Sequence, residues 1–295
     1  MGVISDVLDW LSCPHCATAL IADGAADAAD PPSRLLCEEG HAFDIARPGY
    51  VSLLTGAGST GTADTPAMVA DRAAFLAAGH YAGIADLVAA LAAESDRAVA
   101  EVAVAAEETA QQHGTCILDL GAGTGYYLAR VLDAVDRPGI ALDISKHAAR
   151  HAAKAHPRIG AVVADAWGGL PVRGRAAAVV LNVFAPRNAH EMRRVLHPAG
   201  RAIVVVPEAG HLRELVEEYG LLAVDERKSE RLREQFAGRF RVESEHPFRR
   251  TPTLSAEEVA RVIGMGPNAW HAGAERVRSG GAVSIEVRAY VLSPQ

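Results

Sequence analysis

Short apolar runs alternate with amphipathic stretches through the middle of the chain. From Thr115 onward, segments in which apolar residues recur every three or four positions separate these runs. The runs are Cys116–Leu120, Ile140–Asp143, Ala161–Ala164, Ala178–Leu181 and Ala202–Val206. Apolar runs of this length, with helices between them, are typical of parallel strands buried on both faces. The pattern therefore predicts an α/β fold with a Rossmann-like, doubly wound sheet.

The flanking segments follow other patterns. Before the sheet, the pair Thr65-Pro66 starts a predicted helix that ends at Gly79. A second predicted helix, Ile84–Ala93, leads into the Ala/Glu-rich segment Glu94–Gln112. The linker before them is predicted at Thr55–Thr65, which is rich in Gly, Ser and Thr. After the sheet, the predicted elements are a helix at Leu212–Tyr219, a strand at Phe240–Ser244, a helix at Ser255–Ile263 and a strand at Ala282–Leu292.

Three of the four cysteines lie near the N-terminus with the spacing of metal ligands. A C-x₂-C pair is followed, after twenty residues, by C-x₃-H. Two short chelating turns supply the four ligands that tetrahedral zinc requires, so we predict a structural zinc site. Its ligands are Cys13, Cys16, Cys37 and His41. His15 is the alternative to His41, and Cys116 is predicted to be a core residue. A disulfide and a redox C-x₂-C are both disfavoured, since no export signal and no thioredoxin-like pattern accompany the pair.

Composition excludes several classes of protein. The 295 residues are 49% hydrophobic and 22% charged with a net charge of −7, which excludes intrinsic disorder. No apolar run approaches the ~20 residues of a membrane span, and Met1–Trp10 lacks the basic residues of a secretory signal. We therefore expect a cytoplasmic protein without membrane contact. The acidic balance argues against indiscriminate nucleic-acid binding but leaves room for a local basic surface. Its candidate residues are Arg34, Arg47, Arg72, Arg249 and Arg250.

A glycine loop follows the first strand of the predicted sheet. Asp119 precedes three alternate glycines (Gly121, Gly123 and Gly125), and Asp143 ends the next strand. Glycines here let the backbone turn sharply and approach a ligand, and a carboxylate at position 143 can accept both hydroxyls of a ribose. Dinucleotide sites use G-x-G-x-x-G beneath a pyrophosphate. An acid before the loop instead suits a cation, so the motif favours S-adenosylmethionine, which carries a sulfonium and an amino group.

The third and fourth predicted strands add to this site. Asp165, at the end of the third, is placed to accept a hydrogen bond from the adenine amino group, although a helix cap is the other interpretation. Asn182 and Phe184 follow the fourth strand, where we predict that Asn182 binds the edge of a target base and Phe184 stacks on it, with core packing as the alternative for Phe184. No cysteine lies nearby, so the target is predicted to be a nitrogen or oxygen whose own lone pair attacks the methyl group.

The whole chain resembles the 23S rRNA (guanine-N1) methyltransferases of the RlmA type, in particular the TlrB-like branch of macrolide (tylosin) resistance. The resemblance is carried by Cys13-Pro14-His15-Cys16, Gly40-His41-Ala42-Phe43-Asp44, Ala78-Gly79-His80-Tyr81, Leu118-Asp119-Leu120-Gly121, Asn182-Val183-Phe184-Ala185-Pro186-Arg187-Asn188 and Met265-Gly266-Pro267. It implies zinc at the four ligands named above and S-adenosylmethionine at the glycine loop, Tyr81 and His211. The full set of expected cofactor contacts is Tyr81, Asp119, Gly121, Ala122, Gly123, Thr124, Gly125, Asp143, Ile144, Asp165, Ala166, Asn182 and His211.

The resemblance also implies an activity. Family members act as dimers and methylate a guanine of 23S rRNA in the loop of hairpin 35, beside the macrolide site. The expected organisation is a zinc-binding RNA-recognition module (residues 1–58), a helical connector (59–112) and a class I S-adenosylmethionine-dependent methyltransferase domain (113–295). Two alternatives remain open: a methyltransferase acting on a small natural product, and an RNA-binding zinc protein with a vestigial cofactor pocket.

Overall fold

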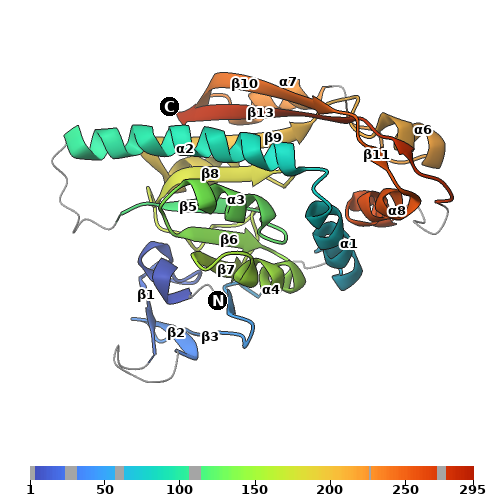
Figure 1. Cartoon of the computed structure of the whole chain (residues 1–295). Helices are drawn as coiled ribbons and strands as arrows, with labels where there is room; N and C mark the ends of the chain where they lie inside the picture. The colour runs from blue at the N-terminus through green and yellow to red at the C-terminus, as the bar shows by residue number, and fades with distance from the viewer. Residues whose placement is uncertain (1–3, 24–31, 57–62, 106–113, 226, 271–276) are drawn as a thin grey trace.

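The computed structural model describes residues 4–23, 32–56, 63–105, 114–225, 227–270 and 277–295. An eight-stranded sheet forms its centre, in the order β10-β13-β9-β8-β5-β6-β7-β4 (Figure 1). Its strands are β4 (Tyr50–Ser52), β5 (Cys116–Leu120), β6 (Gly139–Asp143), β7 (Ile159–Val163), β8 (Ala177–Val183), β9 (Leu196–Pro207), β10 (Phe240–Arg250) and β13 (Ile285–Pro294). The strands from β4 to β9 pair in parallel, whereas β13 and β10 are antiparallel additions at one edge.

Helices cover both faces of the sheet. They are α1 (Pro66–Ala77), α2 (Ala82–Ala105), α3 (Tyr126–Ala134), α4 (Lys146–Ala155), α5 (Ala189–Val195), α6 (Arg213–Tyr219), α7 (Lys228–Phe236) and α8 (Ala256–Gly264). In β8, Val179 and Leu181 join the core beneath α2 and α3, whereas Val180 joins the core of the opposite face. This alternation explains why the strand reads as one continuous apolar run. The predicted doubly wound fold is confirmed.

Several predicted boundaries differ from the structure. The helix expected at Ile84–Ala93 and the first part of the Ala/Glu-rich segment form one helix, α2, while residues 106–112 lie outside the described residues. The strand expected at Ala282–Leu292 is divided: β12 (Gly281–Ala282) pairs with β11 (Thr253–Leu254), and β13 begins at Ile285. β10 continues to Arg250, because an edge strand with one exposed face alternates polar and apolar residues and gives no apolar run.

The N-terminal segment forms a second, smaller sheet that is attached to the first. Its strands are β1 (Leu20–Ala22), β2 (Arg34–Cys37) and β3 (Ala42–Asp44), and they follow the 3-10 helix η1 (Ile4–Trp10). η1 packs on β7, where Gly160 leaves room for Val7: a Cβ on this glycine would lie 2.2 Å from Val7 Cγ2. β4 pairs with β7 over Tyr50–Ser52. The large sheet therefore contains a strand from before the predicted domain boundary at residue 58 as well as strands from after it.

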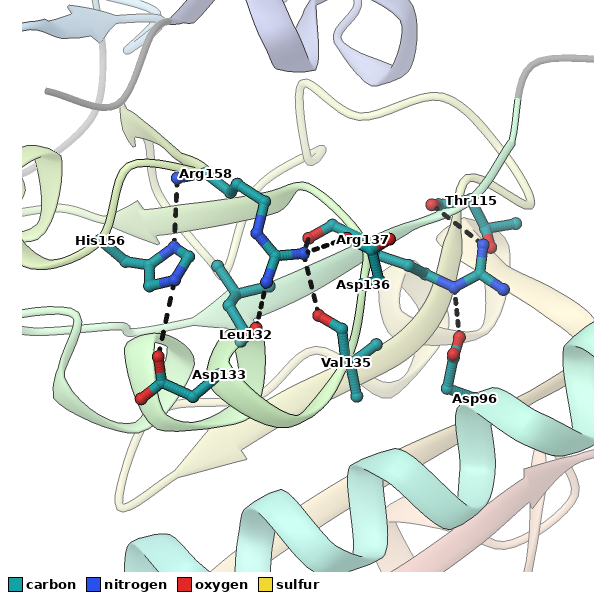
Figure 2. A network of polar contacts seen from close by, with 9 residues as sticks. All are labelled: Asp96, Thr115, Leu132, Asp133, Val135, Asp136, Arg137, His156 and Arg158. Carbon is teal, nitrogen blue, oxygen red and sulfur yellow. Dashed lines mark hydrogen bonds and ion pairs between the residues drawn. The ribbon is translucent and has the colours of Figure 1, made fainter.

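Two arginines lie just before β6 and β7, at the amino ends of these strands, and their side chains contact α2 and α3 (Figure 2). Arg158 Nη1 donates to the carbonyl oxygens of Val135 and Arg137 at 3.0 and 3.1 Å, and Arg158 Nη2 donates to that of Leu132. Arg137 pairs with Asp96 of α2. A cation near the last carbonyls of α3 offsets the negative end of the helix dipole. These contacts fix α2 and α3 against the sheet.

Across the described residues, no single helix is long and apolar enough to cross a membrane. Among those residues, α1 and α2 together have sufficient length and hydropathy, and they meet at a bend of 83°. The apolar side chains of α2 include Ile84, Val88 and Ala92, all buried in the core beneath the sheet.

Candidate zinc centre and active site

The four predicted zinc ligands meet at one point of the small sheet. Their ligand atoms all lie within 4.8 Å of one another. Cys16 Sγ is 3.6 Å from Cys37 Sγ, and His41 Nδ1 is 3.6 Å from Cys13 Sγ and 3.2 Å from Cys37 Sγ. A zinc ion with bonds of about 2.3 Å to sulfur in a tetrahedron sets sulfur atoms about 3.7 Å apart. The donor set and its geometry therefore fit a structural zinc ion with four protein ligands.

Local turns aim these side chains inward. Gly40, with a φ of +81°, lies between Cys37 and His41, and its N–H donates to the Cys37 carbonyl oxygen at 3.0 Å. The His15 ring stacks on the His41 ring with a centroid distance of 4.8 Å and lies outside the four-atom cluster. His41 is thus the fourth ligand, and His15 packs against it. Cys116 is buried in β5, as predicted for a core residue.

The glycine loop joins β5 to α3 with three residues at positive φ. Two of them also permit close packing. A Cβ on Gly121 would lie 2.4 Å from Ala185 Cβ, in the loop after β8, and a Cβ on Gly125 would lie 3.0 Å from Ala152 Cα of α4. Gly125 is the N-cap of α3, where its φ is 78°. Larger residues at these positions would separate the loop from its neighbours.

A cavity of about 1140 Å³ opens over this loop. Most of the predicted cofactor contacts line it: Tyr81, Asp119, Gly121, Ala122, Gly123, Thr124, Asp143, Ile144, Asp165, Ala166 and His211. Phe184 also lines the cavity, whereas Gly125 and Asn182 do not. Segments far apart in the sequence therefore meet where the parallel strands end, the usual position of a ligand site in such a sheet.

Acidic side chains surround the glycine loop. Asp119 is 1% exposed, and its Oδ2 has no hydrogen-bond partner. Burial, together with the charge of Asp143, raises the pKa of Asp119 to about 8. Asp143 accepts hydrogen bonds from the N–H groups of Gly123 and Ser145, both at 2.8 Å. A buried carboxyl group without a partner is costly, so Asp119 fits a ligand that brings a donor or a cation.

Asp165 serves partly as a local cap. Its Oδ1 accepts a hydrogen bond from the Trp167 N–H at 2.9 Å, and the residue also lines the cavity. The helix cap that the sequence offered as the other interpretation is wrong, because a turn and not a helix follows Asp165, and the adenine contact stays a prediction. Trp167 lies at the same cavity with 63% of its surface exposed.

An aromatic cluster closes another side of the cavity. The Phe184 ring lies 6.0 Å from the rings of both Tyr81 and His211 and 6.4 Å from that of Tyr127. Phe184 has a φ of 56°, a strained value for a bulky residue, and such strain is concentrated at functional sites. His211 Nδ1 accepts a hydrogen bond from the Glu286 N–H at 3.2 Å, and burial lowers the pKa of His211 to about 4. A neutral His211 therefore carries its proton on Nε2 and donates it to Tyr81 Oη, 3.2 Å away.

Asn182 holds the loop that carries Phe184. Its Nδ2 donates to the carbonyl oxygens of Leu120 and Pro186 at 3.3 and 2.8 Å, and the residue is 1% exposed. These bonds connect the end of β5 to the loop after β8. The contacts make Asn182 a positioning residue, while its predicted contact with a base stays a prediction.

The sequence did not assign several cationic residues to the cavity wall. Arg72 of α1 pairs with Asp64, and its Nη2 donates to the Met265 carbonyl oxygen at 2.6 Å, so this predicted RNA contact faces the cavity. Arg187 and Lys228 line the cavity as well. Arg187 stands in the motif at Asn182–Asn188, and Lys228 is one of only three lysines in the chain. Arg34 pairs instead with Asp44 on the small sheet, and Arg249 lies near Glu208 and Glu286.

Comparison with known proteins connects both sites to one family. Residues 117–200 match the family described as a methyltransferase domain, and residues 11–55 match the zinc ribbon described as the N-terminal region of RlmA. A Streptomyces fradiae protein named 23S rRNA (guanine(748)-N(1))-methyltransferase is 44% identical over 90% of this chain and 88% of its own length. The chain belongs to the family of 23S rRNA (guanine-N1) methyltransferases. A Micromonospora griseorubida member, provisionally named a 23S rRNA (guanine-N(1)-)-methyltransferase, is 47% identical over 90% of this chain and 88% of its own length.

Membership confirms the family, the fold class and the two cofactors predicted for this methyltransferase. S-adenosylmethionine is the cofactor of its methyltransferase domain, and the Cys₃His cluster is the structural zinc site of its ribbon. The unpartnered Asp119 carboxyl group and the close-packed glycine loop fit such a cofactor. Which residues contact it, and which act on the substrate, remain predictions.

Proposed function

We propose that this methyltransferase transfers a methyl group from S-adenosylmethionine to N1 of a guanine in 23S rRNA. The target is in the loop of hairpin 35, and the methyl group obstructs macrolide binding. The observation that carries the proposal is the 44–47% identity to named relatives over 90% of the chain, a span that includes zinc ribbon and methyltransferase domain alike.

The acids of the cavity bind the cofactor in this proposal. S-adenosylmethionine supplies an electrophilic methyl group on a positively charged sulfur. Asp119, which burial keeps protonated near neutral pH, offers a carboxyl group that a cationic ligand would ionise, and Asp143 is held by two backbone N–H groups in position for the ribose hydroxyls. Asp165 keeps one carboxylate oxygen for the adenine amino group.

The aromatic cluster receives the substrate. Bases reach such pockets by leaving the stack, and aromatic rings stabilise an extruded base by stacking. Phe184 presents its exposed ring for this purpose, and Asn182 holds the turn that carries it. Guanine N1 must lose its proton as the methyl bond forms. Holding nucleophile and methyl group in line, away from bulk water, supplies much of the acceleration.

The proposal includes the oligomeric state of the protein and its location in the cell. We propose a homodimer acting in the cytoplasm, where ribosomal RNA is found in bacteria. Gel filtration with light scattering tests the dimer, and a monomer that retains full activity on ribosomal RNA would contradict it.

Primer extension tests the activity. A methyl group on guanine N1 blocks base pairing, so reverse transcriptase should stop one nucleotide before the target after incubation of the protein with S-adenosylmethionine and rRNA from a strain lacking this methylation. A hairpin-35 transcript should show the same stop. Absence of a stop in both RNAs, with the cofactor bound in calorimetry, would instead favour a small-molecule substrate.

A further inference from the structure

The cavity contains charges that the predicted cofactor contacts do not use. The cationic side chains lining it are Arg72, Arg187, Lys228 and Arg231. Arg72 pairs with Asp64, and Arg231 pairs with Asp225 at 2.6 Å. No carboxylate pairs with Arg187 or Lys228 within the part of the chain that the structure describes. These two cations remain available to a ligand.

The loop after β8 and α7 place the two cations in the wall of the same cavity. Gln235 Nε2 donates to the Arg187 carbonyl oxygen at 3.0 Å, which joins α7 to the loop after β8. Lys228 is the first residue of α7, and Arg187 Nη1 is buried without a hydrogen-bond partner. The pKa of Lys228 is lowered by burial and then by the charge of Arg187, while Asp225 opposes this shift. Two like charges in one partly buried wall are unfavourable unless an anion lies near them.

Their position is on the substrate side of the cavity. Arg187 follows Phe184 by three residues, and the charge of Lys228 contributes to the lowered pKa of His211 in the aromatic cluster. The acids lie at the glycine loop. Arg72 already supplies a cation there, since its Nη1 is 3.3 Å from the point that a Cβ on Gly123 would occupy. The cavity is therefore acidic at the loop, and its wall with Phe184 carries positive charge that no carboxylate of the described residues pairs.

We propose that Arg187 and Lys228 bind a phosphate group of the RNA next to the target guanosine. The inference rests on the proposed function and adds residues that position its substrate. A nucleotide that leaves the stack carries its phosphates with it, and phosphate contacts fix the register of nucleic acid on a protein. Because the chain has a net charge of −7, such contacts must come from local cations.

Salt dependence of RNA binding tests the proposal. Binding of a hairpin-35 transcript is measured over a series of KCl concentrations for wild type, Arg187→Gln, Lys228→Gln and the charge-retaining Lys228→Arg. Arg227→Gln is the matched control, since Arg227 precedes Lys228, pairs with the exposed Glu230 and does not line the cavity. Each lost phosphate contact should lower the slope of log affinity against log salt by about 0.7 to 1 and weaken binding roughly tenfold. Lys228→Arg and Arg227→Gln should behave as wild type.

If the two cations bind an anionic group other than an RNA phosphate, the variants give different results, and each of these results overturns the proposal. If the cations bind the cofactor carboxylate, Arg187→Gln weakens S-adenosylmethionine in calorimetry and leaves the salt slope unchanged. If they stabilise negative charge on guanine O6, turnover and its pH profile change while RNA affinity does not. Wild-type salt slopes in both glutamine variants would likewise exclude a phosphate contact.

A second titration separates this proposal from the proposed function. With S-adenosylhomocysteine present, wild type should bind guanosine 5′-monophosphate more tightly than guanosine, and the glutamine variants should lose this preference. The titration requires no turnover and no ribosomal RNA. Equal binding of the two ligands by wild type would overturn the phosphate site even if methylation is observed, whereas a preference without methylation would leave the site standing and remove the proposed target.

Discussion

The zinc centre draws its ligands from two short turns, whereas the cofactor cavity draws its acids from three strand ends and its walls from distant helices. At the zinc centre the four ligand atoms converge within 4.8 Å, and the metal completes their bonding. In the cavity, Asp119 is buried without a partner for Oδ2. The protein has to be folded before the cavity exists, while the metal is itself part of the fold. The comparison indicates that loss of a zinc ligand damages structure, and loss of a cavity acid damages binding.

Loss of a zinc ligand should have the largest effect. Cys37→Ser removes one of four bonds, and structural zinc contributes about 10–16 kcal/mol in small zinc domains. We expect loss of bound zinc, proteolytic cleavage within residues 11–55 and a more than roughly hundredfold loss of rRNA methylation. Metal content, limited proteolysis and the primer-extension stop measure these effects.

Cys116→Ser is the matched control, since Cys116 is a buried cysteine of β5 outside the cluster. It should keep its zinc and its resistance to proteolysis. Retention of zinc by Cys37→Ser would show that the metal does not depend on all four ligands.

Asp119→Asn should come next in size. A hydrogen bond to a charged group contributes about 1.5–3 kcal/mol, so we expect roughly 10- to 100-fold weaker S-adenosylmethionine binding with zinc retained. Isothermal calorimetry gives the affinity, and Asp86→Asn, at an exposed position of α2, is the control. Unchanged affinity in the Asp119 variant would contradict the assignment of the acids to the cofactor.

Asn182→Ala should have an intermediate effect on turnover. Its two hydrogen bonds hold the loop of Phe184, so we expect roughly a tenfold lower kcat, about 1.4 kcal/mol, with little change in cofactor affinity. Asn182→Asp preserves the shape of the side chain but not its donors, and it should fail similarly. Turnover within a few-fold of wild type in both variants would remove Asn182 from the reaction.

The last expected effect is a pH dependence of stability. The pKa of Asp119 is about 8 in the folded protein, above the ordinary value near 3.8, so between about pH 4 and 8 the folded state keeps a proton that the unfolded state releases. The contribution of this group to stability is therefore lost as the pH rises through that window. Without cofactor, Asp119→Asn should gain in Tm relative to wild type between pH 5 and pH 8. A constant difference in Tm would mean that Asp119 is ionised throughout.

The sequence predicted the zinc centre and the acids because each depends on local spacing or on a strand end. Asp119, Asp143 and Asp165 lie at or near the carboxyl ends of adjacent parallel strands, so topology alone brings them together. The positions of Arg72 and Lys228 at the cavity could not be found in this way. They belong to α1 and α7, whose positions depend on tertiary packing and whose charged residues look like those of any exposed helix.

The pairing of β4 with β7 offers a physical connection through which binding of the metal and binding of the cofactor would affect each other. Leu53 N–H donates to the Val163 carbonyl oxygen at 2.9 Å, two residues before Asp165, so one hydrogen-bonded edge runs from the ribbon to the rim of the cavity. Linkage between two sites is reciprocal in free energy. A chelator that weakens S-adenosylmethionine binding must therefore extract zinc less readily when that ligand is bound.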